Sequence, residues 1–238
     1  FAIAAAMKTD SVTDLSYSLT FVVLAIFAVL RLPAAPTVWQ LVVAALVVIW
    51  GFRLGGYLLA RIMRTGVDHR FDAMRDKPLV FARFWALQAL TVWIVMLPLA
   101  LALPTARAGM PWCLLGGLVW LAGLYLEARS DAEKYRFRND PANKKRPVDC
   151  GLWRYSRHPN YFGEMLVWWG LWLALLPAWG DRPAIALVAA LGPLFLTLLL
   201  LFVSGIPLLE RQSAARYGKA WTEYAKRTSL LVPRPPRR

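Results

Sequence analysis

Six apolar stretches, each about as long as a membrane-spanning helix, constrain the fold of this chain more than any other feature. A helix needs about 20 apolar residues to cross the hydrocarbon core of a bilayer. A lone strand cannot satisfy its backbone hydrogen bonds in lipid, so each stretch is predicted to be helical. The composition agrees, with 58% hydrophobic residues and a mean hydropathy of +0.46 over 238 residues. The predicted spans are 13–31, 37–60, 84–103, 111–127, 161–179 and 184–206.

Lys and Arg are unevenly divided between the two sides that these spans define. Of the 28 basic residues, 24 fall on the side that holds the N-terminal residues and the segments 61–83, 128–159 and 210–238. Only Arg31, Arg107 and Arg182 fall on the other side, and Arg53 lies within a predicted span. By the positive-inside rule, the basic side is predicted to be cytoplasmic. The same rule, with contact to anionic lipid, accounts for most of the net charge of +14.

The sequence therefore predicts an all-α integral membrane protein with one transmembrane domain over residues 1–238. Because the chain opens with Phe1, its first residues could be the end of a further helix, so six to seven transmembrane helices are expected. Short connections predict antiparallel hairpins, whereas the long basic segments and the tail predict a cytoplasmic cap over a cofactor pocket. Pro233 and its neighbours are expected to end the ordered tail, leaving Arg237 and Arg238 frayed.

Several classes of site are not predicted. The two Cys and two His have no zinc-ligand spacing, so no metal is expected. Walker and dinucleotide-binding glycine signatures are missing from the sequence, as are nucleic-acid recognition modules. The expected partners are the lipid bilayer and a small molecule. Any cofactor must bind among the helices and their cytoplasmic segments, and the dense Lys and Arg of 128–159 suit one that carries phosphates.

Polar residues inside the predicted spans are candidates for function because charged groups are costly in lipid. Asp14 has Tyr17 one turn further along, and Arg53 has Tyr57 four residues on. Structural alternatives remain open: Asp14 could cap the helix at the interface, and Arg53 could extend its charge to the membrane surface. Glu164 shares a helical face with Asn160, although an acid near a helix N-terminus is also favourable by itself.

One segment carries a family resemblance. Arg157-His158-Pro159-Asn160-Tyr161, followed by Gly163-Glu164, resembles the C-terminal signature of the steroid 5-alpha reductase family. Sterol reductases and isoprenylcysteine carboxyl methyltransferases are similar at Arg-His-Pro. Further residues are similar to a bacterial branch of the reductases, which implies a location in a bacterial inner membrane. They are Ser130-Asp131 to Arg138, Asp140-Pro141-Ala142-Asn143, Gly151-Leu152-Trp153, Glu210, Tyr217-Gly218 and Tyr224.

The resemblance implies a membrane reductase that transfers hydride from NADPH to the C=C bond of a conjugated enone, such as a 3-oxo-Δ4 steroid. It implies that Asn160 and Glu164 recognise the amide of the cofactor. It places Asp131, Arg138 and Arg146 at the adenosine and phosphate end, and Arg53 and Arg64 near the phosphates. The remaining predicted cofactor contacts are Tyr155, Arg157, His158, Tyr161, Glu210 and Tyr217.

The substrate end departs from the family pattern. Animal members have a Gln–Glu pair and a Tyr that hold the steroid ketone, whereas this chain has Thr13-Asp14 and Trp50 at those positions. Thr13 and Trp50 are therefore predicted to contact substrate, and Asp14, Tyr17 and Tyr57 are the candidate catalytic donors. A protonated Asp14 could stabilise negative charge that develops on the carbonyl oxygen.

Two other functions remain open. A membrane methyltransferase of the isoprenylcysteine carboxyl methyltransferase type, using S-adenosylmethionine, explains Arg157-His158-Pro159 and Tyr161 equally well. It explains the clustered Arg residues less well, because that cofactor carries no phosphate. A non-enzymatic lipid-binding scaffold explains the topology alone.

Overall fold

The structure is a computed structural model that describes residues 13–65, 77–106, 109, 111–180 and 182–237. The chain divides into two compact units. The N-terminal unit comprises Phe1–Met110 and Leu175–Gly192, and the C-terminal unit comprises Pro111–Ala174 and Pro193–Arg238.

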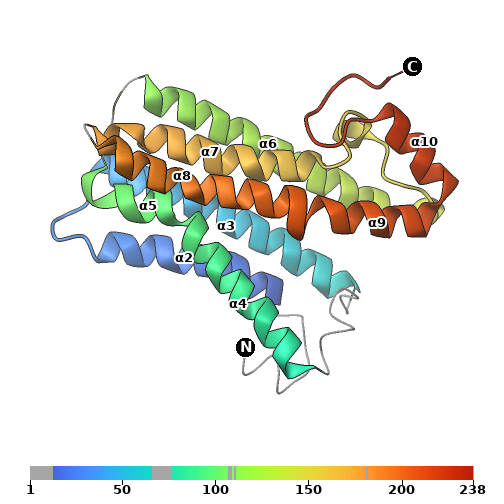
Figure 1. The fold of residues 1–238 in the computed structure, drawn as a ribbon, viewed down its shortest axis with the longest axis horizontal. Coiled ribbons are helices and arrows are strands. Elements are labelled where there is room, and N and C mark those ends of the chain that lie inside the picture. Colours follow the sequence, from blue (N-terminus) through green and yellow to red (C-terminus); the bar gives the residue numbers. More distant parts are fainter. Residues whose placement is uncertain (1–12, 66–76, 107–108, 110, 181, 238) are drawn as a thin grey trace. The chain divides into compact units, whose positions relative to one another are not determined.

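Helices make up nearly all of the described structure (Figure 1), which contains no β-strand beyond an isolated bridge between Ser156 and Ser229. A π-helical turn, Leu199–Val203, follows α8, and short 3₁₀ turns lie at Leu103–Thr105, Pro141–Asn143 and Gly151–Arg154. The α-helices are α2 (Thr13–Leu30), α3 (Val38–Thr65), α4 (Pro78–Val95), α5 (Leu97–Ala102), α6 (Trp112–Asn139), α7 (Pro159–Trp179), α8 (Pro183–Leu198), α9 (Ile206–Tyr217) and α10 (Lys219–Arg227).

The predicted class, an all-α membrane protein, is confirmed. Within the described residues, four stretches are long and apolar enough to cross a membrane: Val38–Arg64, Leu79–Thr105, Pro159–Trp179 and Pro183–Tyr217. The predicted first span is a shorter apolar helix, Leu15–Leu30. The predicted span 111–127 forms the apolar half of α6. The count of six to seven spans stays a prediction, and a helix before α2 falls on residues outside the described part of the chain.

Two expectations about the cytoplasmic cap were wrong. Residues 128–139 were expected in a loop, but they continue α6 to Asn139. Neither Gly nor Pro interrupts them, and Arg129 pairs with Glu133 one turn on at 2.8 Å. Arg237 was expected to fray after the prolines, but its N–H donates to the Arg227 carbonyl at 2.9 Å. Backbone pairing therefore holds the tail in place as far as Arg237. Arg238, for which the same was expected, lies outside the described residues.

In the N-terminal unit, α2 packs on α3 through a pair of small residues. A Cβ added at Gly51 would lie 2.6 Å from Val22 Cγ2, and one at Gly55 would lie 2.8 Å from Ser18 Oγ. Later residues of α3 meet earlier residues of α2, so the two helices are antiparallel. Small residues four apart let membrane helices approach closely, and Gly51 and Gly55 have that spacing.

In the C-terminal unit, α6 and α7 lie side by side (Figure 1) and approach more closely still. Gly116 and Gly123 on α6, and Gly163 and Gly170 on α7, each recur after seven residues. An added Cβ at any of the four would lie 2.2–2.6 Å from backbone nitrogen of the other helix. The contact is therefore backbone against backbone, and because Gly116 meets Ala174 whereas Gly123 meets Val167, the helices are antiparallel.

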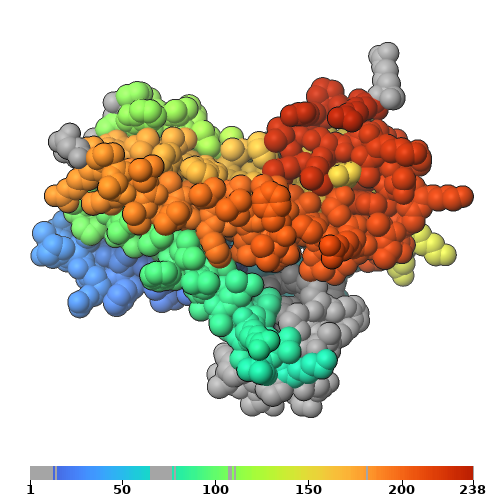
Figure 2. All heavy atoms as spheres, viewed as in Figure 1, coloured from blue at the N-terminus to red at the C-terminus, as the bar shows by residue number. Residues whose placement is uncertain are grey.

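The C-terminal tail closes over the loop that connects these two helices. In the space-filling view of Figure 2, the C-terminal segment (red) covers most of the loop (yellow) on the face shown. Gly218 makes the turn between α9 and α10 with a φ of +53°, which Gly adopts without strain. Beyond α10, the Arg234 N–H donates to the Tyr155 carbonyl at 3.0 Å, and the Arg157 N–H donates to the Ser229 carbonyl at 2.8 Å.

Candidate functional site

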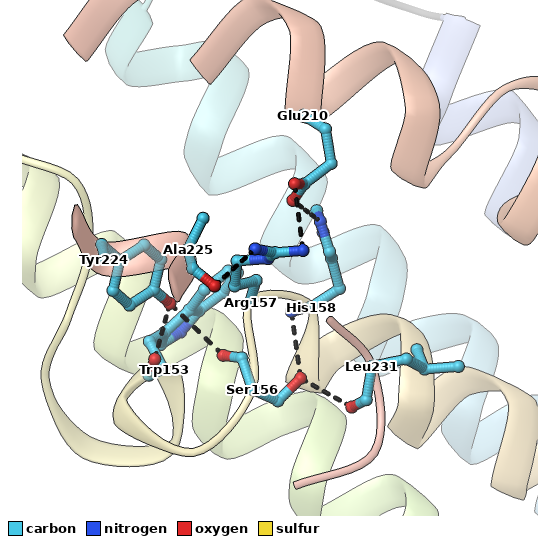
Figure 3. Close-up of polar contacts among 8 residues, drawn as sticks. All are labelled: Trp153, Ser156, Arg157, His158, Glu210, Tyr224, Ala225 and Leu231. Carbon is cyan, nitrogen blue, oxygen red and sulfur yellow. Dashed lines mark hydrogen bonds and ion pairs between the residues drawn. The ribbon is translucent and has the colours of Figure 1, made fainter. Parts of the chain in front are cut away.

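The segment before α7 forms an ion-pair cluster with α9. His158 Nε2 lies 2.8 Å from Glu210 Oε1, and Arg157 Nη2 lies 3.3 Å from Glu210 Oε2 (Figure 3). Tyr161 stacks on the His158 ring with 5.7 Å between ring centroids. Burial lowers the pKa of His158 from its usual 6.5, against the opposing pull of Glu210. A neutral imidazole follows at neutral pH, with Nε2–H donating to the carboxylate.

A second set of hydrogen bonds ties the same segment to α10 and the tail (Figure 3). The buried Tyr224 hydroxyl donates to the Trp153 carbonyl at 2.6 Å, and burial raises the pKa of that phenol. The Ser156 hydroxyl donates to the Leu231 carbonyl at 2.6 Å and accepts from the His158 N–H at 3.1 Å. Arg157 Nη1 donates to the Ala225 carbonyl at 3.0 Å. The start of α7 is therefore fixed by contacts with residues 50 or more positions away in the sequence.

Three of the predicted cofactor residues gather at the end of α6. The Arg138 guanidinium carbon lies 5.2 Å from the centre of the Tyr217 ring, and Arg138 Nη1 donates to the Arg146 carbonyl at 3.1 Å. Arg216 also approaches the Tyr217 ring, at 5.4 Å. Burial lowers the pKa of Arg138, and neighbouring Arg216 adds to that effect. Two guanidinium groups around one aromatic ring form a cluster suited to an anion with a flat ring attached.

The other predicted cofactor residues of this unit lie on or near α6 and α7. Asn160 and Glu164 occupy the first two turns of α7, one turn apart and partly exposed. Asp131 is buried on α6, with 3% of its surface exposed, and Tyr155 is exposed in the loop before α7.

The predicted substrate end lies in the N-terminal unit. Tyr17 packs edge-on against Phe21 at 5.2 Å, and Phe21 packs edge-on against Trp50, which is completely buried. Arg53 lies over the Tyr57 ring at 5.9 Å.

At the start of α2, the Thr13 hydroxyl is buried without a hydrogen-bond partner among the described residues. Asp14 follows it in α2, but its side chain lies outside the described structure. Arg64 lies in the exposed last turn of α3. The predicted set is thus divided between the two units.

Comparison with known proteins identifies the family. Residues 1–228 match the family described as "Protein of unknown function (DUF1295)". The chain belongs to this family. DUF1295 is the steroid 5-alpha reductase-like family, so the resemblance drawn from the signature residues is confirmed.

One curated relative of this DUF1295 protein is the Delta(14)-sterol reductase TM7SF2 of Mus musculus, which is 29% identical over 138 residues. The match covers 52% of this chain and 31% of the relative, so the chain spans about a third of the length of the curated protein it matches. No solved structure matches the chain.

Two residues near the site were missed in the predicted set. Glu127 is buried on α6, with 2% of its surface exposed, and lies one turn before Asp131 on the same face. Their spacing of four is visible in the sequence, but only Asp131 was predicted to contact the cofactor, through the family resemblance. Arg216 was missed because it precedes Tyr217 directly, and the sequence does not indicate that both guanidinium groups contact that ring.

The DUF1295 chain offers no group of three His, Cys, Asp or Glu residues that could hold a metal ion among the residues described. Cys113 is buried and Cys150 is exposed, and neither forms a disulfide. The second histidine, His69, lies outside the described part of the chain.

Proposed function

We propose that this protein is a membrane-embedded reductase of the steroid-reductase type, which transfers hydride from NADPH to the C=C bond of a conjugated enone. Membership in the steroid 5-alpha reductase-like family and the similarity to a sterol reductase support this activity. The apolar helices favour a lipophilic substrate that enters from the bilayer, with a 3-oxo-Δ4 steroid as the model.

The observation that carries the proposal is the cluster of Arg138, Arg216 and Tyr217, with Arg146 beside it. Guanidinium groups form paired, charge-assisted hydrogen bonds with phosphate, and they also stack on aromatic rings. NADPH offers both partners, because its adenosine carries a 2′-phosphate. These residues therefore fit the adenosine end of NADPH. They fit S-adenosylmethionine less well, since that molecule has no phosphate.

The start of α7 fits the other end of the cofactor. Asn160 offers a donor and an acceptor, as a carboxamide requires, and Glu164 lies one turn further along. Arg157 and His158 direct their side chains to Glu210 and Ala225. We therefore assign them the role of positioning the first turn of α7 rather than contacting the cofactor directly.

NADPH, when bound, would supply the hydride. The protein's part is to stabilise the negative charge that develops on the enone oxygen. We assign this to Asp14 as a protonated donor, with Tyr17 and Tyr57 as the alternative donors in the same unit. Thr13 and Trp50 would then border the substrate.

A binding experiment tests the cofactor assignment. A ligand that binds only the folded state raises its melting temperature, so the detergent-purified protein is titrated with NADPH, NADH and S-adenosylmethionine. Arg138→Gln should weaken NADPH binding about tenfold or more, because a charge-assisted hydrogen bond contributes roughly 1.5–3 kcal/mol. NADH binding should change much less, since that cofactor lacks the extra phosphate.

Arg136→Gln is the matched control, because Arg136 lies on the same helix, is exposed and has the same charge. If S-adenosylmethionine raises the melting temperature of the wild type and NADPH does not, the methyltransferase function would be favoured instead. Equal NADPH affinity in the wild type and Arg138→Gln would remove Arg138 from the site.

A further inference from the structure

Two cavities lie between the loop before α7 and the C-terminal tail, and they share lining residues. One has a volume of about 540 Å³ and includes Arg154, Arg227 and Arg237 in its lining. The other has a volume of about 280 Å³ and is lined by Arg157, Lys226 and Arg234 together with Arg227 and Arg237. We call the two cavities together the basic groove. Six cationic side chains and one carboxylate, Asp149, line it.

Acidic partners offset only part of this charge. Arg227 lies 3.5 Å from Asp149, Arg157 pairs with Glu210, and Lys226 pairs with Glu223. Arg154, Arg234 and Arg237 have no acidic partner among the residues that the structure describes. Arg157 Nε is buried and has no hydrogen-bond partner there either. The basic groove therefore contains hydrogen-bond donors and positive charges that acidic side chains do not neutralise.

The fold holds these cations together. The backbone of the tail is tied at Arg234, whose N–H donates to Tyr155, and at Arg237, whose N–H donates to Arg227. The Ser156 hydroxyl adds a third tie, to the Leu231 carbonyl. Pro233, Pro235 and Pro236 stiffen the stretch between these contacts. Because the backbone keeps the cations from spreading apart, their mutual repulsion is a cost that a bound anion would relieve.

We propose that the basic groove binds a phosphate-bearing anion other than the hydride donor. Arginine matches phosphate through two parallel hydrogen bonds, and the groove supplies several such groups. None of Arg138, Arg146, Asn160, Glu164 or Tyr217 lines it, although Arg146 pairs with the groove residue Asp149 at 3.7 Å. Arg157, which does line it, has the positioning role proposed above, so the groove is distinct from the residues assigned to contact the cofactor.

The membrane supplies phosphate at the depth of this groove. Arg157 lies two residues before the first residue of α7, and α7 is long enough to cross the hydrocarbon core. Basic pockets at the cytoplasmic ends of membrane helices bind anionic lipid headgroups, and the basic side of this chain is the one predicted to be cytoplasmic. A soluble phosphate compound has the same chemistry and would reach the groove from the water.

The test uses the full chain in detergent and follows its melting temperature by tryptophan fluorescence. In one arm, the micelles contain phosphatidylglycerol or, for comparison, phosphatidylcholine. In the second arm, sodium pyrophosphate is compared with sodium chloride at equal ionic strength, and a third arm uses NADPH. The variant is the double substitution Arg234→Gln and Arg237→Gln, which keeps both backbone hydrogen bonds and removes no side-chain ion pair described in the structure. The control is Arg136→Gln, outside the groove.

Phosphatidylglycerol is expected to stabilise the wild type and the control. The double variant should bind it about tenfold more weakly or worse, because each cation near an anionic membrane surface contributes on the order of 1 kcal/mol. A response to pyrophosphate alone, lost in the double variant, would support a soluble phosphate ligand instead. A double variant that responds to both probes like the control, or a wild type that responds to neither, would overturn the proposal. So would a loss of NADPH binding in the double variant, because the groove would then belong to the cofactor site.

Discussion

Helix packing differs between the α2–α3 pair of the N-terminal unit and the α6–α7 pair of the C-terminal unit. In the N-terminal unit, Gly51 and Gly55 of α3 face side-chain atoms of α2, namely Val22 Cγ2 and Ser18 Oγ. In the C-terminal unit, Gly116 and Gly123 of α6 and Gly163 and Gly170 of α7 face backbone atoms. A side chain can rotate away from an added methyl group, whereas a helix backbone cannot move without shifting the whole helix.

Polar contacts differ in the same direction. The described contacts between α2 and α3 include aromatic edges such as Phe21 on Trp50. Both units contain hydrogen bonds between distant residues, such as Gln40 to Leu103 in the N-terminal unit and Tyr224 to Trp153 in the C-terminal unit. The C-terminal unit also has ion pairs between distant residues, such as His158 with Glu210. The proposed cofactor residues of the C-terminal unit therefore lie where α6 and α7 pack backbone against backbone, which provides the rigid support that a preorganised binding site requires, whereas Arg53 and Arg64 lie on α3. The proposed substrate residues lie where side chains have more freedom to adjust.

The largest effect is expected from a methyl group added between α6 and α7. Gly116→Ala places a Cβ 2.2 Å from the Ala174 nitrogen, and we expect a loss of roughly 3 kcal/mol in unfolding free energy because overpacking forces the backbone apart. Gly55→Ala meets the Ser18 hydroxyl at 2.8 Å, with Leu15 Cδ1 and Ser18 Cβ at an ordinary 3.6 Å, and should cost less than about 1 kcal/mol.

Chemical unfolding in detergent measures both effects. Gly117→Ala, with no atom within 4 Å of the added Cβ, is the control beside Gly116. Equal losses at Gly116 and Gly55 would contradict the difference between the units.

A smaller effect is expected from removing Glu210. Glu210→Ala leaves Arg157, with 14% of its side chain exposed, without its carboxylate. Breaking a buried pair costs about 3–5 kcal/mol, and because Glu210 is 24% exposed we expect about 2 kcal/mol. Glu223→Ala removes the exposed partner of Lys226 and should cost less than about 1 kcal/mol. Thermal unfolding of both variants would show no difference if the cluster were only a surface ion pair.

The smallest effect concerns pH. Burial lowers the pKa of His158 in the folded chain below the value of 6.5 that applies in the unfolded chain. Between these two pKa values the unfolded chain therefore binds a proton that the folded chain does not bind. Stability from this source is therefore complete above pH 6.5 and is lost as pH falls from 6.5 through the folded pKa. His158→Gln keeps a donor for Glu210 but cannot titrate, so its melting temperature should fall less between about pH 7 and pH 5. Parallel pH profiles for the two proteins would show that His158 is not the group responsible.

The helical class and the family could be predicted because they depend on local signals. Apolar runs of about 20 residues indicate helices wherever they occur, and Arg157-His158-Pro159-Asn160-Tyr161 is contiguous. The extension of α6 to Asn139 was missed because charged residues were interpreted as a loop, although they include good helix formers and an i, i+4 ion pair.

The cluster around the start of α7 could not be predicted in the same way. Glu210 lies 52 residues from His158, and Tyr224 lies 68 residues from Ser156. No pattern in the sequence specifies those pairings. The glycines at intervals of seven in α6 and α7 are visible in the sequence, but the spacing alone does not show which helix they face. Their meaning depends on knowing that the two helices are neighbours.

The measurement that tests the central claim most directly is transfer of an isotope. The full-length protein in liposomes is given a 3-oxo-Δ4 steroid and NADPH that carries deuterium on its reactive nicotinamide carbon, and the products are analysed by mass spectrometry. The account predicts a saturated ketone that contains one deuterium, with about 10²–10³-fold slower formation in Asp14→Leu and partial activity in Asp14→Asn. A reduced product without deuterium, or no reduction together with methyl transfer from S-adenosylmethionine to a lipid acceptor, would contradict it.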